Sequence, residues 1–325
     1  MATIKDVAKA AGVSISTVSA ALNGTAPVKE STRQKILEAC EALGYRPNRL
    51  ARGLKTKRSY TIGVIIPELT NPFFPEVVRA IEHKAKEYNY NTILCDTDDD
   101  PEVGLSDLHL LIEKQVDGII LIGGVIPRDA ILSSRRLPTV AIEKDFNIPQ
   151  VSCVMADLMG GAYEAVSHLI GMGCRRIAYI TCRMGKGVVY RRFEGYKLAL
   201  KDNQIPFDAS LVRESSPDFE GGCEAMKSFK EVPPDAVFSY NDVMAMGALK
   251  ACSLMGVRIP GDMSIVGFDD IDAVSFTSPP LSTVALPKQE MGSLATEILI
   301  NTILKKEKPR NVSLSTKLVI RKSCK

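Results

Sequence analysis

Residues 3–19 read TIKDVAKAAGVSISTVS, a run that predicts two short helices joined by a tight turn. The hydroxyl of Thr3 can cap the first helix, Gly12 ends it, and Ser14 starts the second. Apolar residues recur at helical spacing on the expected inner faces, at Ile4, Val7, Ala8, Ala11, Val18, Ala21 and Leu22. The residues that point outward from the second helix are Ile15, Ser16, Ser19 and Ala20. This geometry places a second helix in the major groove of DNA, although paired small helices also occur in domains that do not bind DNA.

A third helix is expected up to Leu43. Ser31 and Gln34 form a capping box at its start, and Gly44 stands where a glycine commonly ends a helix. Its expected inner side consists of Ile36, Leu37, Cys40 and Leu43. Residues 1–45 therefore form a small all-α head.

Charge is unevenly distributed along the 325 residues. Residues 1–60 hold 11 Lys and Arg against 4 Asp and Glu, which leaves 30 basic and 34 acidic residues for the remainder. No acidic residue occurs between Arg46 and Ser59. A basic head on a mildly acidic body indicates nucleic acid as a partner of the head, although a solvated linker explains the basic segment equally well.

Three segments of the head carry a resemblance to a known family. They are the run from Thr3 to Ser19, ALNG at residues 21–24 and GYRPN at residues 44–48. This ordered set resembles the lactose-repressor family of bacterial transcription regulators. The resemblance implies a recognition helix over Ser14 to Asn23. Ala20 stands where the family commonly has an arginine, so a guanine contact worth about 1 to 3 kcal/mol is lost there, and the operator sequence does not transfer from relatives.

Residues 46–59 are expected to form a hinge helix or linker. A helix of about eight residues is shorter than the ~12 to 15 that hold together in water, so its folding is expected to be coupled to DNA binding. The resemblance places Leu54 as an apolar wedge in a minor-groove step, against the alternative of an inert linker leucine. The residues expected at the DNA surface are Thr3, Ser14, Ile15, Ser16, Thr17, Ser19, Ala20, Asn23, Tyr45, Asn48, Arg49, Arg52, Leu54 and Lys55.

The body alternates β-rich runs with helical stretches, which predicts parallel sheets covered by helices on both faces. A first set of strands is expected at residues 61–67, 91–96, 117–123, 139–143 and 151–157. A second set is expected at residues 176–182, 235–240, 264–268 and 281–285, followed by a helix over 289–304 and a last strand over 314–321. The fold class is thus an α/β domain of two lobes, which resembles type I periplasmic binding proteins.

The expected domains are a helix-turn-helix head over 1–45, a hinge over 46–59 and an effector-binding and dimerisation domain over 60–325. Its first lobe spans about 60–158 plus 288–325, and its second about 159–287. Ligands of open parallel sheets bind beyond the carboxyl ends of the strands, so the cleft between the lobes is the expected pocket.

The resemblance also assigns ligand contacts, in the NPFF loop after the first strand, in RFEGY, in DFE and in NDVMAMG. Arginine and aspartate clamp sugar hydroxyls with charge-assisted hydrogen bonds, and phenylalanine stacks on the sugar ring. For Phe73 or Phe219 taken alone a core role is the commoner interpretation, and within the matching motifs the two interpretations are about even. The expected effector-binding residues are Asn71, Phe73, Phe74, Glu143, Arg192, Phe219, Asp242 and Asp269. A pentose or nucleoside-like effector is the first hypothesis, and another sugar is an alternative.

Other classes of protein are disfavoured by what the sequence lacks. The longest apolar run, from Gly118 to Ile126, is about half the ~20 residues that cross a bilayer, and Met1 to Gly12 has no signal-peptide pattern. The eight cysteines form no C-x-x-C pair, and no dinucleotide, phosphate-loop, calcium-loop or serine-nucleophile motif is complete. We therefore expect a cytoplasmic protein with no membrane association and no catalytic residues, metal or cofactor.

These observations predict a sequence-specific transcription regulator, more specifically a repressor. It would bind a pseudo-palindromic, double-stranded DNA operator as a homodimer and be controlled by a small sugar-like effector in the cleft. One alternative is a sugar-binding module without specific DNA reading, and another is a sugar-modifying enzyme with an accessory head. The sequence does not tell whether the effector releases DNA or promotes DNA binding. Nor does it identify the regulated genes or a protein corepressor.

Overall fold

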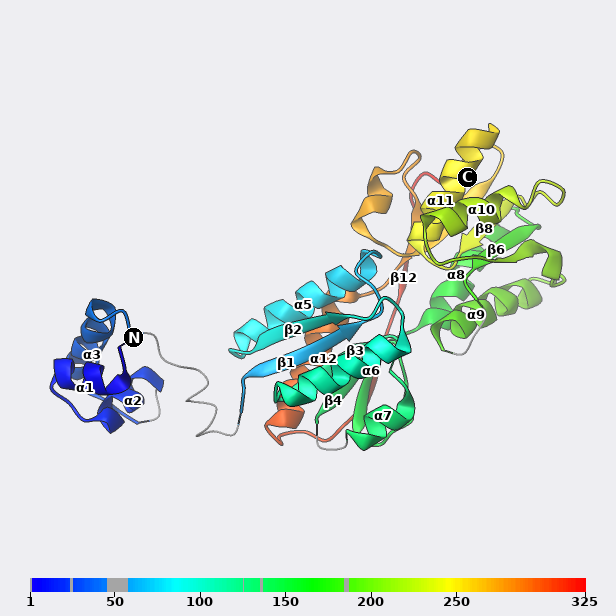
Figure 1. The fold of residues 1–325 in the computed structure, drawn as a ribbon. Coiled ribbons are helices and arrows are strands. Elements are labelled where there is room, and N and C mark those ends of the chain that lie inside the picture. Colours follow the sequence, from blue (N-terminus) through cyan, green and yellow to red (C-terminus); the bar gives the residue numbers. More distant parts are fainter. Residues whose placement is uncertain (1, 24–25, 46–57, 125, 135–136, 184–186) are drawn as a thin grey trace. The chain divides into compact units, whose positions relative to one another are not determined.

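The computed structural model describes the chain except for residues 1, 24–25, 46–57, 125, 135–136 and 184–186. It divides into two compact units, Met1–Ser59 and Tyr60–Lys325 (Figure 1). Each unit has its own buried core, so we describe them separately.

The head consists of α1 (Ile4–Ala11), α2 (Ile15–Asn23) and α3 (Glu30–Ala42). The backbone N–H and the hydroxyl of Thr3 both donate to Oδ2 of Asp6 at 2.8 Å, and Gly12 ends α1 in the left-handed conformation with φ 65°. Ser14 Oγ accepts a hydrogen bond from the backbone N–H of Thr17 at 3.1 Å, which starts α2 as expected. The core of the head consists of Val7, Ala8, Val18, Ala21, Ile36 and Cys40.

The start and the inner face of the third helix differ from the prediction. The helix begins at Glu30 without a side-chain cap, and Gln34 Nε2 donates to Glu38 Oε1 one turn further on instead of closing a capping box. Leu37 and Leu43 are 45% and 40% exposed. In the described part of the head the core is shared among three short helices, and α3 contributes two buried residues to it, Ile36 and Cys40.

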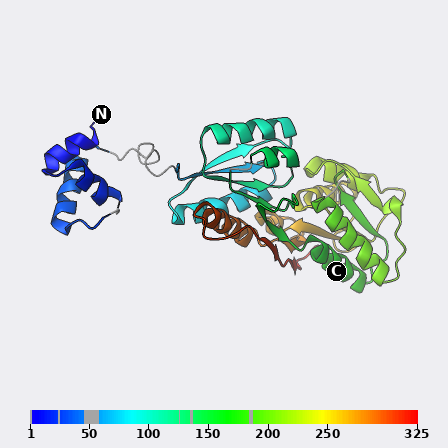
Figure 2. The ribbon, with the colours of Figure 1, turned by 90° about the horizontal axis from the view of Figure 1, so that it is seen from below.

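The first lobe contains a six-stranded parallel sheet in the order β11-β5-β4-β3-β1-β2. Its strands are β1 (Thr61–Ile66), β2 (Asn91–Asp96), β3 (Gly118–Ile122), β4 (Thr139–Ile142), β5 (Val151–Ala156) and β11 (Asn311–Leu314). Its helices are α5 (Phe73–Glu87), α6 (Pro101–Glu113), α7 (Arg128–Ser133) and α12 (Lys288–Ile303). Figure 2 shows α5 and α12 on one face of this sheet and α6 and α7 on the other. Alternate strand residues accordingly enter two different cores, for example Val64 and Ile65 of β1.

The second lobe contains another six-stranded sheet, in the order β12-β10-β9-β8-β6-β7. Its strands are β6 (Ile177–Thr181), β7 (Val212–Glu214), β8 (Ala236–Ser239), β9 (Ser264–Asp269), β10 (Ser282–Ala285) and β12 (Lys317–Val319). All neighbours are parallel except β10 and β12, which are antiparallel. Its helices are α8 (Leu158–Gly171), α9 (Val188–Asp202), α10 (Phe219–Lys227) and α11 (Asp242–Met255), with two short 3₁₀ turns, η1 (Ala209–Leu211) and η2 (Asp272–Phe276).

The chain passes between the lobes three times, after β5, after β10 and after β11. The third passage interrupts the segment over 314–321, so the prediction of a single last strand there was wrong. That segment is two strands, of which β11 completes the first sheet and β12 the second. The first lobe therefore does not extend to Lys325, because residues 317–319 pair with β10 and Ser323 accepts from Ile265 N–H. The three-residue strand β7 was also missed, because a run this short has no clear alternation.

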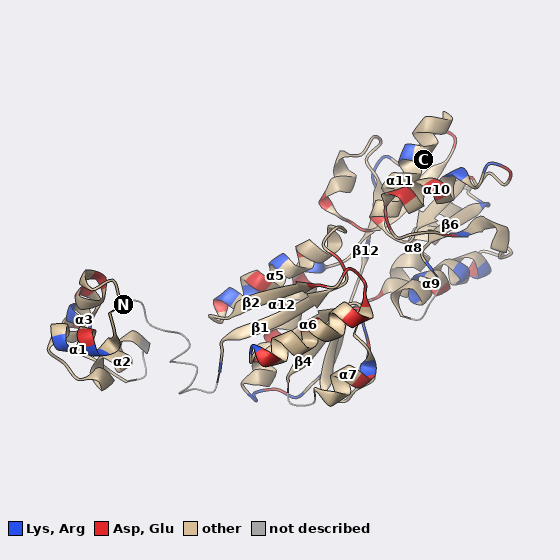
Figure 3. Cartoon of the chain, in the orientation of Figure 1, with Lys and Arg blue, Asp and Glu red and all other residues tan. Residues whose placement is uncertain are grey.

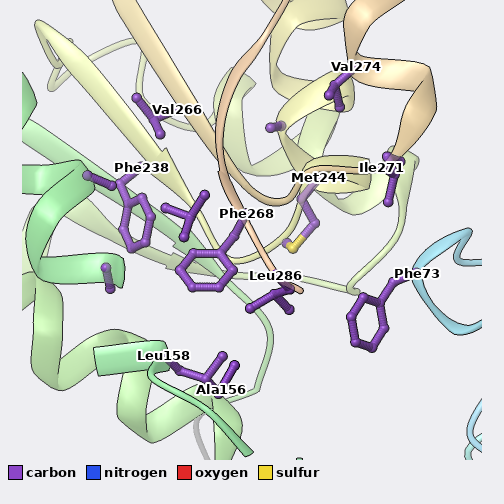
Figure 4. Close-up of a cluster of buried hydrophobic side chains, with 14 of the residues drawn as sticks. Phe73, Ala156, Leu158, Phe238, Met244, Val266, Phe268, Ile271, Val274 and Leu286 are labelled. Carbon is purple, nitrogen blue, oxygen red and sulfur yellow. The ribbon is translucent and has the colours of Figure 1, made fainter. Parts of the chain in front are cut away.

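The core of the second lobe positions the strand ends that face the first lobe. Figure 4 shows Phe268 of β9 between Phe238 of β8 and Leu286, while Phe73 approaches from the first lobe. On the outer layer, α10 and α11 pack closely because each contributes a glycine. A Cβ on Gly222 would lie 2.0 Å from Met244 O, and one on Gly247 would lie 2.0 Å from Phe219 O. This packing holds the N-terminal ends of both helices beside each other.

Among the described residues, none of the helices has the length and apolarity required to cross a membrane.

Candidate functional site

The first candidate site is the outer surface of α2 in the head. Ser14, Ile15 and Ser16 are exposed, Thr17, Ser19 and Ala20 are half-buried, and Thr3 is exposed at the start of α1. The hydroxyl of Ser14 lies 2.7 Å from Ser16 Oγ and 2.8 Å from Thr17 Oγ1, so three hydroxyls cluster at the start of α2. This start carries short polar side chains and Ile15, the types that contact base edges and phosphates.

Of the other residues expected at the DNA surface, two lie in the described part of the head and five do not. Tyr45 is half-buried against the core of the head, and Asn23 is the last residue of α2. The remaining five lie outside the described residues, namely Asn48, Arg49, Arg52, Leu54 and Lys55. The wedge role of Leu54 and the hinge helix therefore stay predictions.

The second candidate site is a cavity of about 790 Å³ inside the body, lined by residues of both lobes. Segments that follow β1, β2, β3 and β4 line it from the first lobe, and segments that follow β6, β7 and β8, together with the last residue of β9, line it from the second. The cavity thus lies at the carboxyl ends of both sheets, the position where open parallel sheets bind ligands.

Six of the eight expected effector-binding residues line this cavity. They are Asn71, Phe73, Phe74, Glu143, Arg192 and Asp269. Asn71 Oδ1 accepts the backbone N–H of Phe73 at 3.1 Å, which orders the start of α5. The rings of Phe73 and Phe74 meet edge to face with centroids 5.2 Å apart. The NPFF loop therefore brings an amide and two aromatic rings to one wall of the cavity.

Arg192 and Asp269 form a buried ion pair at the opposite wall. Arg192 Nη2 lies 3.0 Å from Asp269 Oδ1, and the side chains are only 6% and 5% exposed. The guanidinium carbon lies 4.0 Å from the ring centroid of Phe268 and 4.6 Å from that of Tyr240, and Nη1 donates to the carbonyl oxygen of Tyr240. Burial raises the pKa of Asp269, although the charges of Arg192 and Lys288 lower it. Stacking and pairing together fix the guanidinium as a rigid donor in the wall.

The turn that carries Asp269 is braced from the first lobe. Asp269 and Asp270 both have positive φ, 112° and 54°, a conformation that non-glycine residues rarely adopt. Lys288, the first residue of α12, donates from Nζ to the carbonyl oxygens of both residues. The same Nζ lies 3.1 Å from Glu76 Oε2 of α5. The ammonium group of Lys288, in the first lobe, therefore stabilises the strained turn at Asp269 and Asp270 in the second lobe.

The structure does not place Phe219 and Asp242 on the cavity wall. Asp242 is fully buried, where Oδ2 accepts from Ile271 N–H at 2.9 Å and Oδ1 accepts from Thr283 Oγ1 at 2.6 Å. Both residues are the first of a helix, Phe219 of α10 and Asp242 of α11. The residues before them, Asp218 and Asn241, line the cavity instead.

This displacement by one residue has a local cause. Asp218 and Asn241 are helix caps with extended backbone, and each accepts a backbone N–H within its own helix, from Gly221 and Met244. Asn241 Nδ2 also donates to the carbonyl oxygen of Pro217 at 3.0 Å, which ties the two capping loops together. A cap sits in the loop at the carboxyl end of the strand, whereas the first helical residue is already turned toward the core.

Sequence reasoning missed several other residues that line the cavity. Chief among them are Glu68, Asp98, Asp99, Asp218, Tyr240 and Asn241. Asp98 and Asp99 have positive φ, and burial together with the charge of Asp98 raises the pKa of Asp99. Their position after a strand was the available signal. Within the described ranges, no group of three or more His, Cys, Asp or Glu side chains could hold a metal ion.

Comparisons with known proteins find matches for both units of the chain. Residues 3–48 match the family of bacterial regulatory proteins, lacI family, and residues 59–322 match the periplasmic binding proteins and sugar binding domain of the LacI family. The ribose operon repressor of Haemophilus influenzae is 37% identical over 327 residues, which cover 99% of this chain and 98% of that protein.

Two solved structures extend the comparison. The lac repressor dimer bound to operator and an anti-inducer has a TM-score of 0.87 at 28% identity, covering 99% of this chain and 98% of that one. A LacI family regulator from Enterococcus faecium with bound ribose has a TM-score of 0.76 at 30% identity, covering 81% of this chain and 98% of that one. Because both units match over nearly their whole length, the chain belongs to the LacI family of bacterial transcription regulators, with a helix-turn-helix head and a sugar-binding type of body.

Proposed function

We propose that this LacI-family regulator is a repressor whose effector is an unmodified monosaccharide, with a pentose such as D-ribose as the first candidate. The observation that supports this most is the buried Arg192–Asp269 pair, stacked on Tyr240 and Phe268, in a cavity that also presents Phe73. A fixed guanidinium and a carboxylate suit vicinal hydroxyls, and an aromatic face suits the C–H face of a sugar ring. The ribose bound to the Enterococcus faecium relative supports the same class of ligand.

The ligand would control the arrangement of the two lobes. Asn71, Phe73 and Glu143 belong to the first lobe, whereas Arg192 and Asp269 belong to the second. A ligand held by both sets favours the arrangement in which both reach it at once, and three chain passages carry any change between the lobes. The coupling free energy between effector and operator is expected to be about 1 to 3 kcal/mol.

DNA recognition would follow from dimerisation. One head reads one half-site, so a homodimer reads a pseudo-palindrome, as the operator complex of the lac repressor dimer illustrates for that protein. We expect the protein to act in the cytoplasm, where its operator DNA is found. We also expect binding without chemistry in the cavity, because the relatives compared above are regulators.

Selection of genomic DNA fragments by the purified protein tests this proposal. The fragments are sequenced after selection with and without D-ribose, D-xylose, D-glucose and adenosine. A two-fold-symmetric site whose recovery changes with one compound supports the proposal and reveals the sign of the switch.

Two other results would contradict it. Sugar binding without any enriched site would favour a sugar-binding module that does not read DNA specifically. Conversion of a sugar during incubation, detected by chromatography, would favour an enzyme.

A further inference from the structure

Glu143 connects the cavity to the first passage between the lobes. It follows β4 with a φ of 59°, and its Oε1 accepts the backbone N–H of Ala156 at 2.6 Å. Ala156 is the last residue of β5, and Asp157 after it caps α8 of the second lobe. Glu143 is only 7% exposed, and its Oε2 has no hydrogen-bond partner among the described residues. Because the residue lines the cavity, Oε2 is the oxygen left for a ligand.

The surroundings of this carboxyl disfavour its negative charge. Burial raises the pKa of Glu143 to about 7, although the hydrogen bond from Ala156 and the charge of Arg192 lower it. Asp269 raises this pKa further, and Arg191 lowers it. The negative charge of Asp269, which lies 3.0 Å from Arg192, offsets part of the attraction between Arg192 and a charged Glu143.

The other described residues that line the cavity include more acidic than basic side chains. Glu68, Asp98, Asp99 and Asp218 line the same cavity, against Arg183 and the paired Arg192 as the described cationic residues. Cys182 and Tyr240 complete the titratable lining, and burial raises the pKa of both. Figure 3 shows acidic residues in the segment that leads into α6. A ligand that brought its own negative charge would meet repulsion here, whereas an uncharged ligand would not.

We propose that Glu143 binds the effector as a neutral carboxylic acid, donating a hydrogen bond from Oε2 to an oxygen of an unphosphorylated ligand. The inference rests on the proposed function, since it concerns the ligand of the same cavity. Glu143 then differs from Asp269, which acts as a carboxylate beside its arginine. The carboxylic acid selects a ligand with an acceptor oxygen at this wall, such as a ring, carbonyl or hydroxyl oxygen.

A first experiment needs no ligand and decides the protonation state. The C=O stretching band of a protonated carboxyl is followed by infrared spectroscopy between about pH 5 and pH 9, in the wild type and in Glu143→Gln. We expect the wild type to show a band that is missing from the variant and that disappears with a midpoint near pH 7, in addition to any band of Asp242, whose pKa burial also raises. The matched control is Glu164→Gln, which removes an exposed carboxyl of α8 and is expected to leave the band unchanged. A wild type whose spectra match those of Glu143→Gln over the whole pH range overturns the proposal.

A second experiment tests the donor role with D-ribose, D-xylose, D-glucose and adenosine as probes in titration calorimetry. The amide of Glu143→Gln can accept from Ala156 and donate to the ligand, so it mimics the neutral acid. We expect the wild-type affinity to fall about tenfold per pH unit above the pKa, and the affinity of the variant to stay constant. D-ribose 5-phosphate is expected to bind at least about tenfold more weakly than D-ribose, because it adds negative charge.

The outcomes separate this inference from the proposed function. An affinity that rises with pH, or a Glu143→Gln variant that binds more than about tenfold worse at pH 6, overturns the donor role. If none of the probes binds, the proposed effector class fails, while the infrared band still decides whether Glu143 carries the proton.

Discussion

Replacing Asp242 tests whether this residue supports the effector cavity from behind its wall. Its carboxylate accepts two hydrogen bonds in a fully buried position, from Ile271 N–H at 2.9 Å and from Thr283 Oγ1 at 2.6 Å. Asp242→Ala leaves both donors without an acceptor, and each such group costs about 1 to 3 kcal/mol. Burial raises the pKa of Asp242 well above its usual value, so removing the acid also relieves a desolvation cost. We therefore expect a net loss of about 2 to 4 kcal/mol in the free energy of unfolding.

The assay is urea unfolding followed by circular dichroism, with Asp242→Asn as the matched variant. Asparagine keeps one acceptor oxygen, so about half of the loss is expected, and the effector response is expected to persist. The turn at Asp269–Ile271 would still be held by Lys288. Wild-type stability in Asp242→Ala would refute the supporting role. Wild-type stability in Asp242→Asn with loss of the effector response would instead show that Asp242 contacts the ligand directly.

Four further predictions concern the head and the cavity. Leu54→Ala is expected to weaken operator binding and reduce DNA bending while sparing sugar affinity, measured by gel mobility shift on permuted fragments; unchanged operator affinity would rule out the wedge. Ala20→Arg is expected to add a guanine preference at one base pair of each half-site, worth about 1 to 3 kcal/mol, in a fragment selection; an identical selected site would contradict it. Arg192→Met leaves Asp269 buried without its partner and is expected to weaken D-ribose binding at least tenfold, with operator binding retained in the absence of sugar. The native pKa of Glu143 is raised from 4.5 to about 7, so stability is lost as pH rises through this window, by about 3 kcal/mol at 1.36 kcal/mol per unit. The stability of Glu143→Gln relative to the wild type is thus expected to increase from pH 5 to pH 8, and a difference that does not depend on pH would count against the raised pKa.

Most secondary structure could be predicted because its determinants are local. The alternation of β-rich runs and helical stretches located nine of the twelve strands to within a few residues, whereas the single strand expected over 314–321 covers β12 and only the last residue of β11. Strong local signals such as Gly12 and Ser14 determined where α1 ends and α2 begins. The capping box at Ser31 was wrong because the same residue types occur inside helices, where Gln34 bonds Glu38 one turn away.

Membership of the cavity was predicted in part. Glu143 and Asp269, at strand ends, were predicted from the parallel topology together with the resemblance, and Asn71 in the loop after β1 and Arg192 on α9 from the motifs that carry the resemblance. The prediction of Phe219 and Asp242 was wrong by one position in each case. The preceding residues, the helix caps Asp218 and Asn241, line the cavity instead. A sequence motif identifies the segment that reaches the cavity, but the geometry of the helix cap determines which of two adjacent side chains faces it.

Local patterns along the chain were enough to predict the class of the molecule, namely a basic helix-turn-helix head, two α/β lobes and the family to which they belong. Periodicity, caps and motifs act over a few residues, so they can be read along the chain. Three features became visible only in the folded chain: β11 and β12 join different sheets, Lys288 donates to the turn at Asp269, and Glu143 is buried with one oxygen that has no partner among the described residues. Pairing, burial and pKa depend on which distant segments meet, and that is a property of packing in three dimensions.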